Sequence, residues 1–108
     1  MTTFDERERA YEKKFALDEE TKFRAEARRD NLVAQWAVAR LGLTGQAADE
    51  YIRALRNEGV VHRGEGVLLK LRKDLEEAGQ STSEQELRDI MREAMTRAAR
   101  EIGMSAKA

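Results

Sequence analysis

The feature that most constrains this chain is a helical repeat of apolar residues that runs almost to its C-terminus. Apolar side chains recur three or four positions apart, which places them on one face of an α-helix. The repeat predicts four helices, at about 18–41, 45–57, 66–78 and 84–102. Proline, which breaks helix interiors, is absent. We therefore expect an all-α fold, a small four-helix bundle with short connections.

Each of the four expected helices has at least one recognisable end signal. Gly42 and Gly79 each follow an apolar stretch, as a glycine that ends a helix does. Thr44 is a plausible cap for the second helix, and Ser83-Glu84-Gln85-Glu86 fits a capping box for the fourth. These signals predict where the first and third helices end and where the second and fourth begin.

The predicted core is thin for a chain of 108 residues. Burial of its side chains nearly cancels the entropy lost in ordering the chain, so we expect a marginally stable domain. Trp36 is its largest expected member, and Trp36→Ala would cost about 3–5 kcal/mol if the ring is buried. The other residues expected to face the core are Leu32, Val33, Ala37, Leu41, Ala48, Tyr51, Ile52, Leu55, Val67, Leu68, Leu71, Leu75, Leu87, Ile90, Met91, Ala94, Met95, Ala98 and Ile102.

The first 30 residues are too polar to build a core, because eight of them are basic and nine are acidic. A highly charged segment is most often a solvated helix or tail. Here, however, Phe4, Tyr11 and Phe15 are spaced 7 and 4 positions apart, which on a helix gives one narrow stripe. Exposed apolar stripes usually mark an interaction surface. We therefore interpret this region as an arm that binds another protein.

The chain is accordingly expected to have three parts. Residues 1–17 would form a mobile helical arm, frayed when free, which begins at a capping box formed by Thr3 and Glu6. Residues 18–102 would form the helical bundle, and residues 103–108 a disordered tail. The length suits a single domain of this kind.

Composition narrows the classes of function. Charged residues make up 38% of the chain but leave a net charge of −1, which argues against nonspecific binding to nucleic acid or to a membrane surface. The chain has no cysteine, so it forms no disulfide. It has no apolar run near the length of a membrane span and no secretory signal, so we expect a cytoplasmic protein without membrane insertion.

No catalytic or metal-binding pattern is found. Gly59 is expected to end the second helix, and residues 60–66 to connect it to the third. His62, the only histidine, is then an ordinary loop residue, and one histidine among dispersed carboxylates is not a zinc pattern. Ser83 is better explained as a cap than as a nucleophile. There is no phosphate-binding loop motif, so we expect a protein that is not an enzyme.

Several residue blocks resemble the zeta subunit of alphaproteobacterial F-type ATP synthases. The blocks that carry the resemblance are Thr2–Glu8, Glu12–Ala16, Asp18–Glu20, Ala27–Arg29, Trp36 and Leu41–Gly45. The resemblance covers essentially the whole chain and is strongest over residues 2–45. The family often has Phe in place of Tyr11, which keeps an aromatic, and Asn in place of Asp30, which bears on local capping.

This resemblance implies a four-helix protein whose N-terminal segment inhibits ATP hydrolysis by the F1 head. The segment would enter a catalytic interface between the α and β subunits and contact the central-stalk γ subunit. The chain would be a monomer when free and would bind F1 on the cytoplasmic side of the inner membrane, with no nucleic-acid partner. The implied partner-binding residues are Thr3, Phe4, Arg7, Glu8, Arg9, Tyr11, Lys13, Lys14 and Phe15.

No cofactor is expected, although the resemblance also implies weak nucleotide binding, for which the sequence indicates no site. Two other functions stay open. In the first, the chain is a helical self-association or adaptor protein that does not bind F1, and the arm mediates the association. A small DNA-binding module is the third alternative, and its basic residues would be Arg63, Lys70, Arg72 and Lys73.

Overall fold

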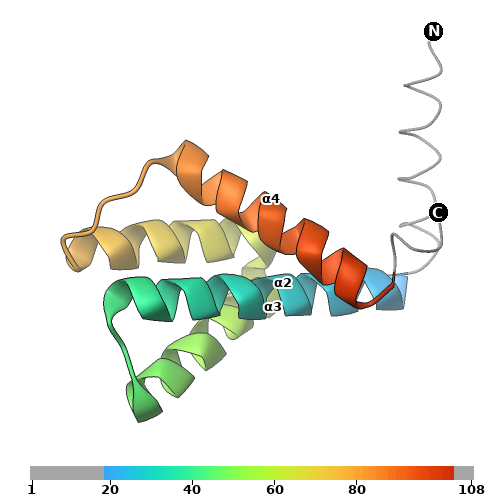
Figure 1. Ribbon diagram of the computed structural model, residues 1–108, viewed down its shortest axis with the longest axis horizontal. Helices are drawn as coiled ribbons and strands as arrows, with labels where there is room; N and C mark the ends of the chain where they lie inside the picture. The colour runs from blue at the N-terminus through green and yellow to red at the C-terminus, as the bar shows by residue number, and fades with distance from the viewer. Residues whose placement is uncertain (1–18, 104–108) are drawn as a thin grey trace, which may run out of the picture.

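The computed structural model describes residues 19–103, which form three α-helices and no strand (Figure 1). Helix α2 comprises Glu19–Leu41, α3 comprises Gly45–Glu77 and α4 comprises Glu84–Glu101. The predicted all-α class is confirmed for this part of the chain. The four-helix bundle is not confirmed, because the structure describes three helices, of which α3 covers both the expected second and the expected third helix and bends sharply between them.

Helix α3 folds back on itself at Arg63, whose φ of 61° and ψ of −158° are not helical. In Figure 1 its green and yellow halves diverge from this bend. Across the hairpin, the Tyr51 hydroxyl donates a hydrogen bond of 2.8 Å to Asp74 Oδ2. The expected seven-residue connection at 60–66 is therefore wrong, because the direction of the chain changes at a single residue and its neighbours remain helical.

The glycines that suggested a loop have a different role in α3. Gly59 and Gly66 are both buried in this helix. A Cβ atom at Gly59 would overlap the Asp30 carboxylate, and one at Gly66 would overlap His62 Cβ. Glycine is therefore required at these two positions because other atoms approach the backbone closely, rather than because the helix ends there.

The helix ends at Gly42 and Gly79 are confirmed. Both glycines have positive φ, 71° and 74°. The amides that follow them bond back five residues, from Leu43 to the Val38 carbonyl at 3.0 Å and from Gln80 to Leu75 at 2.8 Å. These bonds form the Schellman arrangement that satisfies the last carbonyls of a helix.

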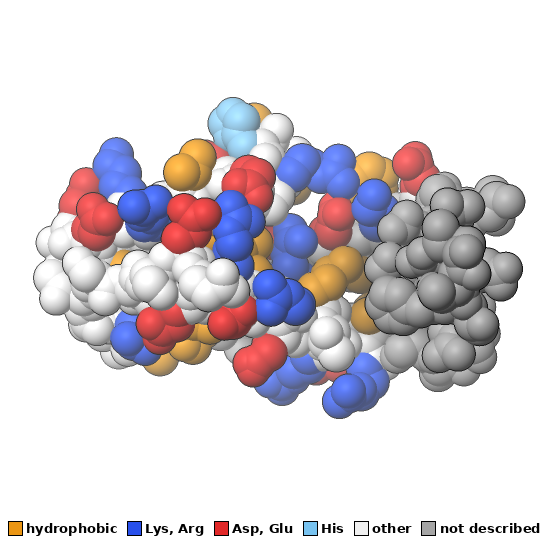
Figure 2. Space-filling model, turned by 90° about the horizontal axis from the view of Figure 1, so that it is seen from above, with side chains coloured by type: hydrophobic (Ala, Val, Ile, Leu, Met, Phe, Trp, Pro, Cys, Tyr) orange, Lys and Arg blue, Asp and Glu red, His pale blue; other side chains and the backbone are white. Residues whose placement is uncertain are grey.

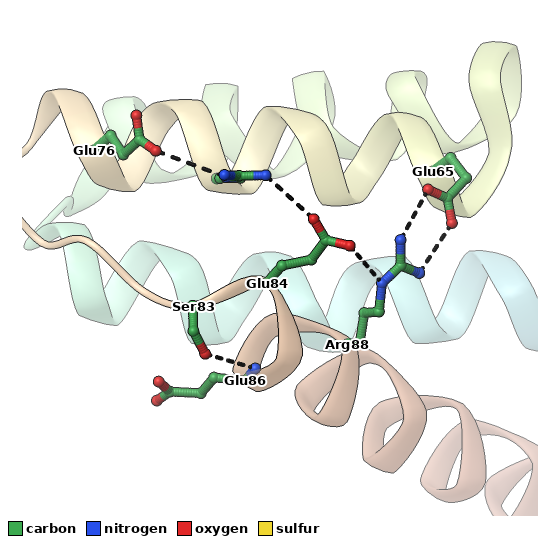
Figure 3. A network of polar contacts seen from close by, with 7 residues as sticks. Glu65, Glu76, Ser83, Glu84, Glu86 and Arg88 are labelled. Carbon is green, nitrogen blue, oxygen red and sulfur yellow. Dashed lines mark hydrogen bonds and ion pairs between the residues drawn. The ribbon is translucent and has the colours of Figure 1, made fainter.

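The two predicted N-terminal caps differ in outcome. Ser83 Oγ accepts a bond of 3.1 Å from the Glu86 amide, as the capping box predicts (Figure 3). Thr44 occupies the cap position of α3 but makes no side-chain cap bond. A capping contribution to helix stability is therefore expected at Ser83 and not at Thr44.

Helix α2 lies at the centre of the molecule, because it packs against both α3 and α4, which contact each other much less. The core forms where these helices meet, and it follows the predicted helix faces closely. Trp36 is only partly buried and packs on the edge of the core, with the Arg40 guanidinium 5.3 Å above its ring. The buried residues of the core cluster are Val33, Ala34, Ala37, Leu55, Val67, Leu68, Leu71, Leu75, Leu87 and Met91.

Candidate partner-binding surface

The partner-binding residues predicted from the sequence lie outside the residues that the structure describes. They are Thr3, Phe4, Arg7, Glu8, Arg9, Tyr11, Lys13, Lys14 and Phe15. The proposed boundaries of the arm and most of the tail fall outside as well. The described surface that follows the arm along the chain lies on α2 and the α3 hairpin.

Near its start, α2 presents an aromatic ring to solvent. Phe23 is 53% exposed, and the Arg63 guanidinium carbon lies 5.2 Å from the centre of its ring. The same guanidinium donates to Glu26, with Nη2 2.9 Å from Oε1 and 3.2 Å from Oε2. Phe23 and Glu26 are three residues apart and so share one side of α2. Arg63 therefore ties the bend of α3 to this side of α2.

A groove of about 550 Å³ runs between α2 and the first half of α3. Val60, on the α3 side, is 78% exposed. Arg53 and Arg56 are also exposed and lie on the same helix. Neither arginine has an ion-pair partner among residues 19–103. The residues that line the groove are Phe23, Glu26, Ala27, Asp30, Arg53, Arg56, Asn57, Gly59, Val60 and Arg63.

Asp30 lies at the base of this groove and is only 4% exposed. Its Oδ1 accepts a bond of 3.0 Å from Arg29 Nε. Burial raises the pKa of Asp30 above 3.8, because desolvation penalises the charged carboxylate more than Arg29 stabilises it. Asp30 was considered above only for local capping. Its spacing from Val33, Ala34 and Ala37 places Asp30 on the buried face of α2. Its burial could therefore have been predicted from the sequence.

A second cluster of charges joins α3 to the start of α4 (Figure 3). Arg88 contacts Glu65 on α3 through both guanidinium amino groups, at 3.1 and 3.3 Å. Its Nε also donates to Glu84 at 3.1 Å, and Glu84 accepts from Arg72 at 3.2 Å. These side chains are largely exposed, so each pair adds little to stability. The cluster mainly fixes how α4 begins against α3.

Three of the four basic residues considered for DNA binding, all except Lys73, pair with acidic side chains in this structure. Arg72 pairs with Glu76 and Glu84, Lys70 pairs with Asp74 at 3.2 Å, and Arg63 pairs with Glu26. On the face drawn in Figure 2, acidic and basic side chains are interspersed. A DNA-binding surface requires an excess of basic charge, so this arrangement argues against that alternative.

The sequence suggested that His62 lies in a loop, but in the structure it lies within α3. Its Nδ1 is 2.9 Å from Glu58 Oε1, one helical turn away, and the side chain is exposed. Within the described residues no group of three or more histidine, cysteine or acidic side chains is arranged to hold a metal ion. None of the three helices is long and apolar enough to cross a membrane.

Comparison with known proteins identifies a matching family. A family model described as ATPase inhibitor subunit zeta matches residues 1–101, which include the predicted arm and all three described helices. No curated protein and no solved structure matches the chain.

Proposed function

The chain belongs to the ATPase inhibitor subunit zeta family, and from this membership we propose that it inhibits ATP hydrolysis by inserting its N-terminal segment into the F1 head. A member of this family is a regulatory protein and not an enzyme. The proposed insertion site is a catalytic α/β interface, with a further contact to the central-stalk γ subunit. The chain would act in the cytoplasm, bound to F1. The observation that carries the proposal is the family match, which spans both the arm and the body.

The proposed mechanism needs no chemistry from this chain. F1 hydrolyses ATP only while its α/β interfaces open and close in turn, so a helix wedged into one interface would stop the cycle. The aromatic stripe, Phe4, Tyr11 and Phe15, would anchor this helix. At about 150–250 Å² each, the three rings contribute on the order of 12–18 kcal/mol of gross burial energy.

Ordering the arm would cost a similar amount, at roughly 1 kcal/mol per residue for about sixteen residues. The aromatic residues alone would therefore not hold the arm. Polar contacts from Arg7, Arg9, Lys13 and Lys14 would supply the difference. The described part of the chain lowers the cost, because α2 is helical from Glu19 and an arm that extends it avoids the unfavourable first turn of a new helix.

The direct test is an ATP hydrolysis assay on the cognate F1 with the full chain and with a variant that lacks residues 1–16. We expect the full chain to inhibit and the truncated chain not to inhibit. Far-UV circular dichroism should show that the helices of the body remain folded in the truncated chain. A variant that lacks residues 104–108 is the matched control, and it should inhibit as the full chain does. Full inhibition by the chain without residues 1–16 would show that the arm is not the inhibitor.

The aromatic stripe can be tested within the full-length chain. Replacing Phe4, Tyr11 and Phe15 together with alanine should abolish inhibition, because the anchoring apolar area is lost while the charges remain. Unchanged inhibition by this variant would show that the stripe does not anchor the arm.

A further inference from the structure

We propose that the groove between α2 and the first half of α3 is a second docking surface, which receives an acidic segment with exposed aliphatic side chains on the outside of the ATP synthase head. This inference rests on the proposed function, since it assumes that the arm binds the same head. It adds a contact made by the body of the protein, and it assigns a role to residues beyond the arm.

The apolar part of this surface is concentrated in the groove. Large apolar side chains with high exposure in the described residues are Phe23, Val60, Val61 and Leu69. Two of them, Phe23 at 53% and Val60 at 78%, line the same groove from opposite sides. Single exposed apolar residues are common on soluble proteins, whereas neighbouring ones in a hollow are typical of contact sites. The pair would bury well against an aliphatic side chain.

The charges of the groove favour an acidic partner. Glu26 is occupied by Arg63, and Asp30 is buried and bonded to Arg29. Arg53 and Arg56 remain exposed and unpaired within the described part of the chain. Of the ten other arginines in the described residues, seven are paired with carboxylates, as Arg88 is with Glu65, and three are not, namely Arg24, Arg40 and Arg100. Arg56 lies near the buried Asp30 carboxylate, but the guanidinium groups of Arg53 and Arg56 are both exposed and can form charge-assisted hydrogen bonds with carboxylates of a partner.

The position of the groove along the chain favours the same partner. Phe23 is the fifth residue of α2, so it lies roughly 6 Å along the helix axis from Glu19. A partner that binds the whole length of the arm would therefore place its own surface close to the groove. Once the arm is bound, even a weak contact here acts at high effective concentration and slows dissociation.

The test compares two double charge reversals in the full chain. Arg53→Glu with Arg56→Glu alters the groove. Lys73→Glu with Arg100→Glu makes the same change in net charge at exposed basic residues away from it. We expect the groove variant to raise the concentration for half-maximal inhibition of F1 about tenfold, with the same maximal inhibition. The control should change it less than twofold, and added salt should reduce the difference because it screens exposed charges.

A second groove variant guards against loss of folding, since Arg56 lies near the buried Asp30. Arg53→Glu with Val60→Ser leaves Arg56 in place, and circular dichroism reports whether each variant remains helical. Folded groove variants that inhibit as well as the unaltered chain would overturn the docking surface and leave the arm hypothesis intact. Lack of inhibition by the unaltered chain would overturn both. A dimer in sedimentation that the groove variants abolish would assign the groove to a second copy and overturn the present assignment.

Discussion

The close contact between Gly59 and Asp30 gives the sharpest stability prediction, through Gly59→Ala. At an unhindered helix position, replacing glycine with alanine stabilises a helix by about 1 kcal/mol. Here the added methyl would overlap Asp30 Oδ2 and lie 2.9 Å from its Cγ. Overpacking costs about 1–3 kcal/mol, and displacing the carboxylate from Arg29 costs about 1 kcal/mol more. We expect a net loss of about 1–3 kcal/mol in the free energy of unfolding.

Urea unfolding followed by far-UV circular dichroism measures this loss, and Gly64→Ala is a matched control in the same helix. A Cβ at Gly64 would lie 3.6 Å from the Arg29 guanidinium nitrogens and 3.7 Å from Met91 Cε, which is ordinary contact. The control variant should therefore be as stable as the unaltered chain, or more stable by up to about 1 kcal/mol.

A double-mutant cycle with Asp30→Ala isolates the cause. If the carboxylate is what the new methyl meets, Gly59→Ala should cost little or should stabilise the chain once Asp30 is alanine. The coupling energy between the two positions should then be about 1–3 kcal/mol, the size expected for residues in contact. An equal penalty in both backgrounds, or no penalty in either, would refute the proposed contact between α2 and α3.

Two further changes test the buried carboxylate and the cap of α4. The pKa of Asp30 is raised in the folded chain above its usual 3.8, so its stabilising contribution is complete below that pH and is lost as pH rises through the folded value. Asp30→Asn should therefore raise the melting temperature at neutral pH and flatten its dependence on pH, whereas unchanged pH dependence would contradict this assignment. Ser83→Ala should cost about 0.5–2 kcal/mol in urea unfolding, while Thr44→Ala, at a position without a cap bond, should cost close to nothing.

Much of the fold could be predicted from the sequence, because burial follows helical periodicity. Val33, Ala37, Leu55 and Leu71 are all buried as their spacing requires. The helix ends at Gly42 and Gly79 were also predictable, since a positive φ at the end of a helix is a local requirement. These features depend on residues near one another in the chain.

The sequence predicted a break between two helices within residues 60–66, which contain the bend at Arg63, but the form of the α3 hairpin could not be predicted because it depends on contacts between distant residues. Gly59 and Gly66 suggested a loop, whereas their lack of a side chain serves close packing within α3. The chain turns at Arg63, a residue that rarely adopts positive φ. Arg63 is held there by Glu26 and Phe23, which lie far away in sequence.

The candidate site could be predicted only in part from the sequence, for the same reason. Spacing showed the stripe of Phe4, Tyr11 and Phe15, but not the groove formed by two helices.

The central position of α2 has a mechanical consequence. This helix follows directly after residues 1–18 and packs against both α3 and α4. If the arm is bound as proposed and the rotor pulls on it, the force is transmitted along the axis of α2. Yielding would then require sliding the middle helix past both neighbours at once, instead of peeling an outer one away. Such a shear geometry would let a small domain resist force better than its thermodynamic stability alone would suggest.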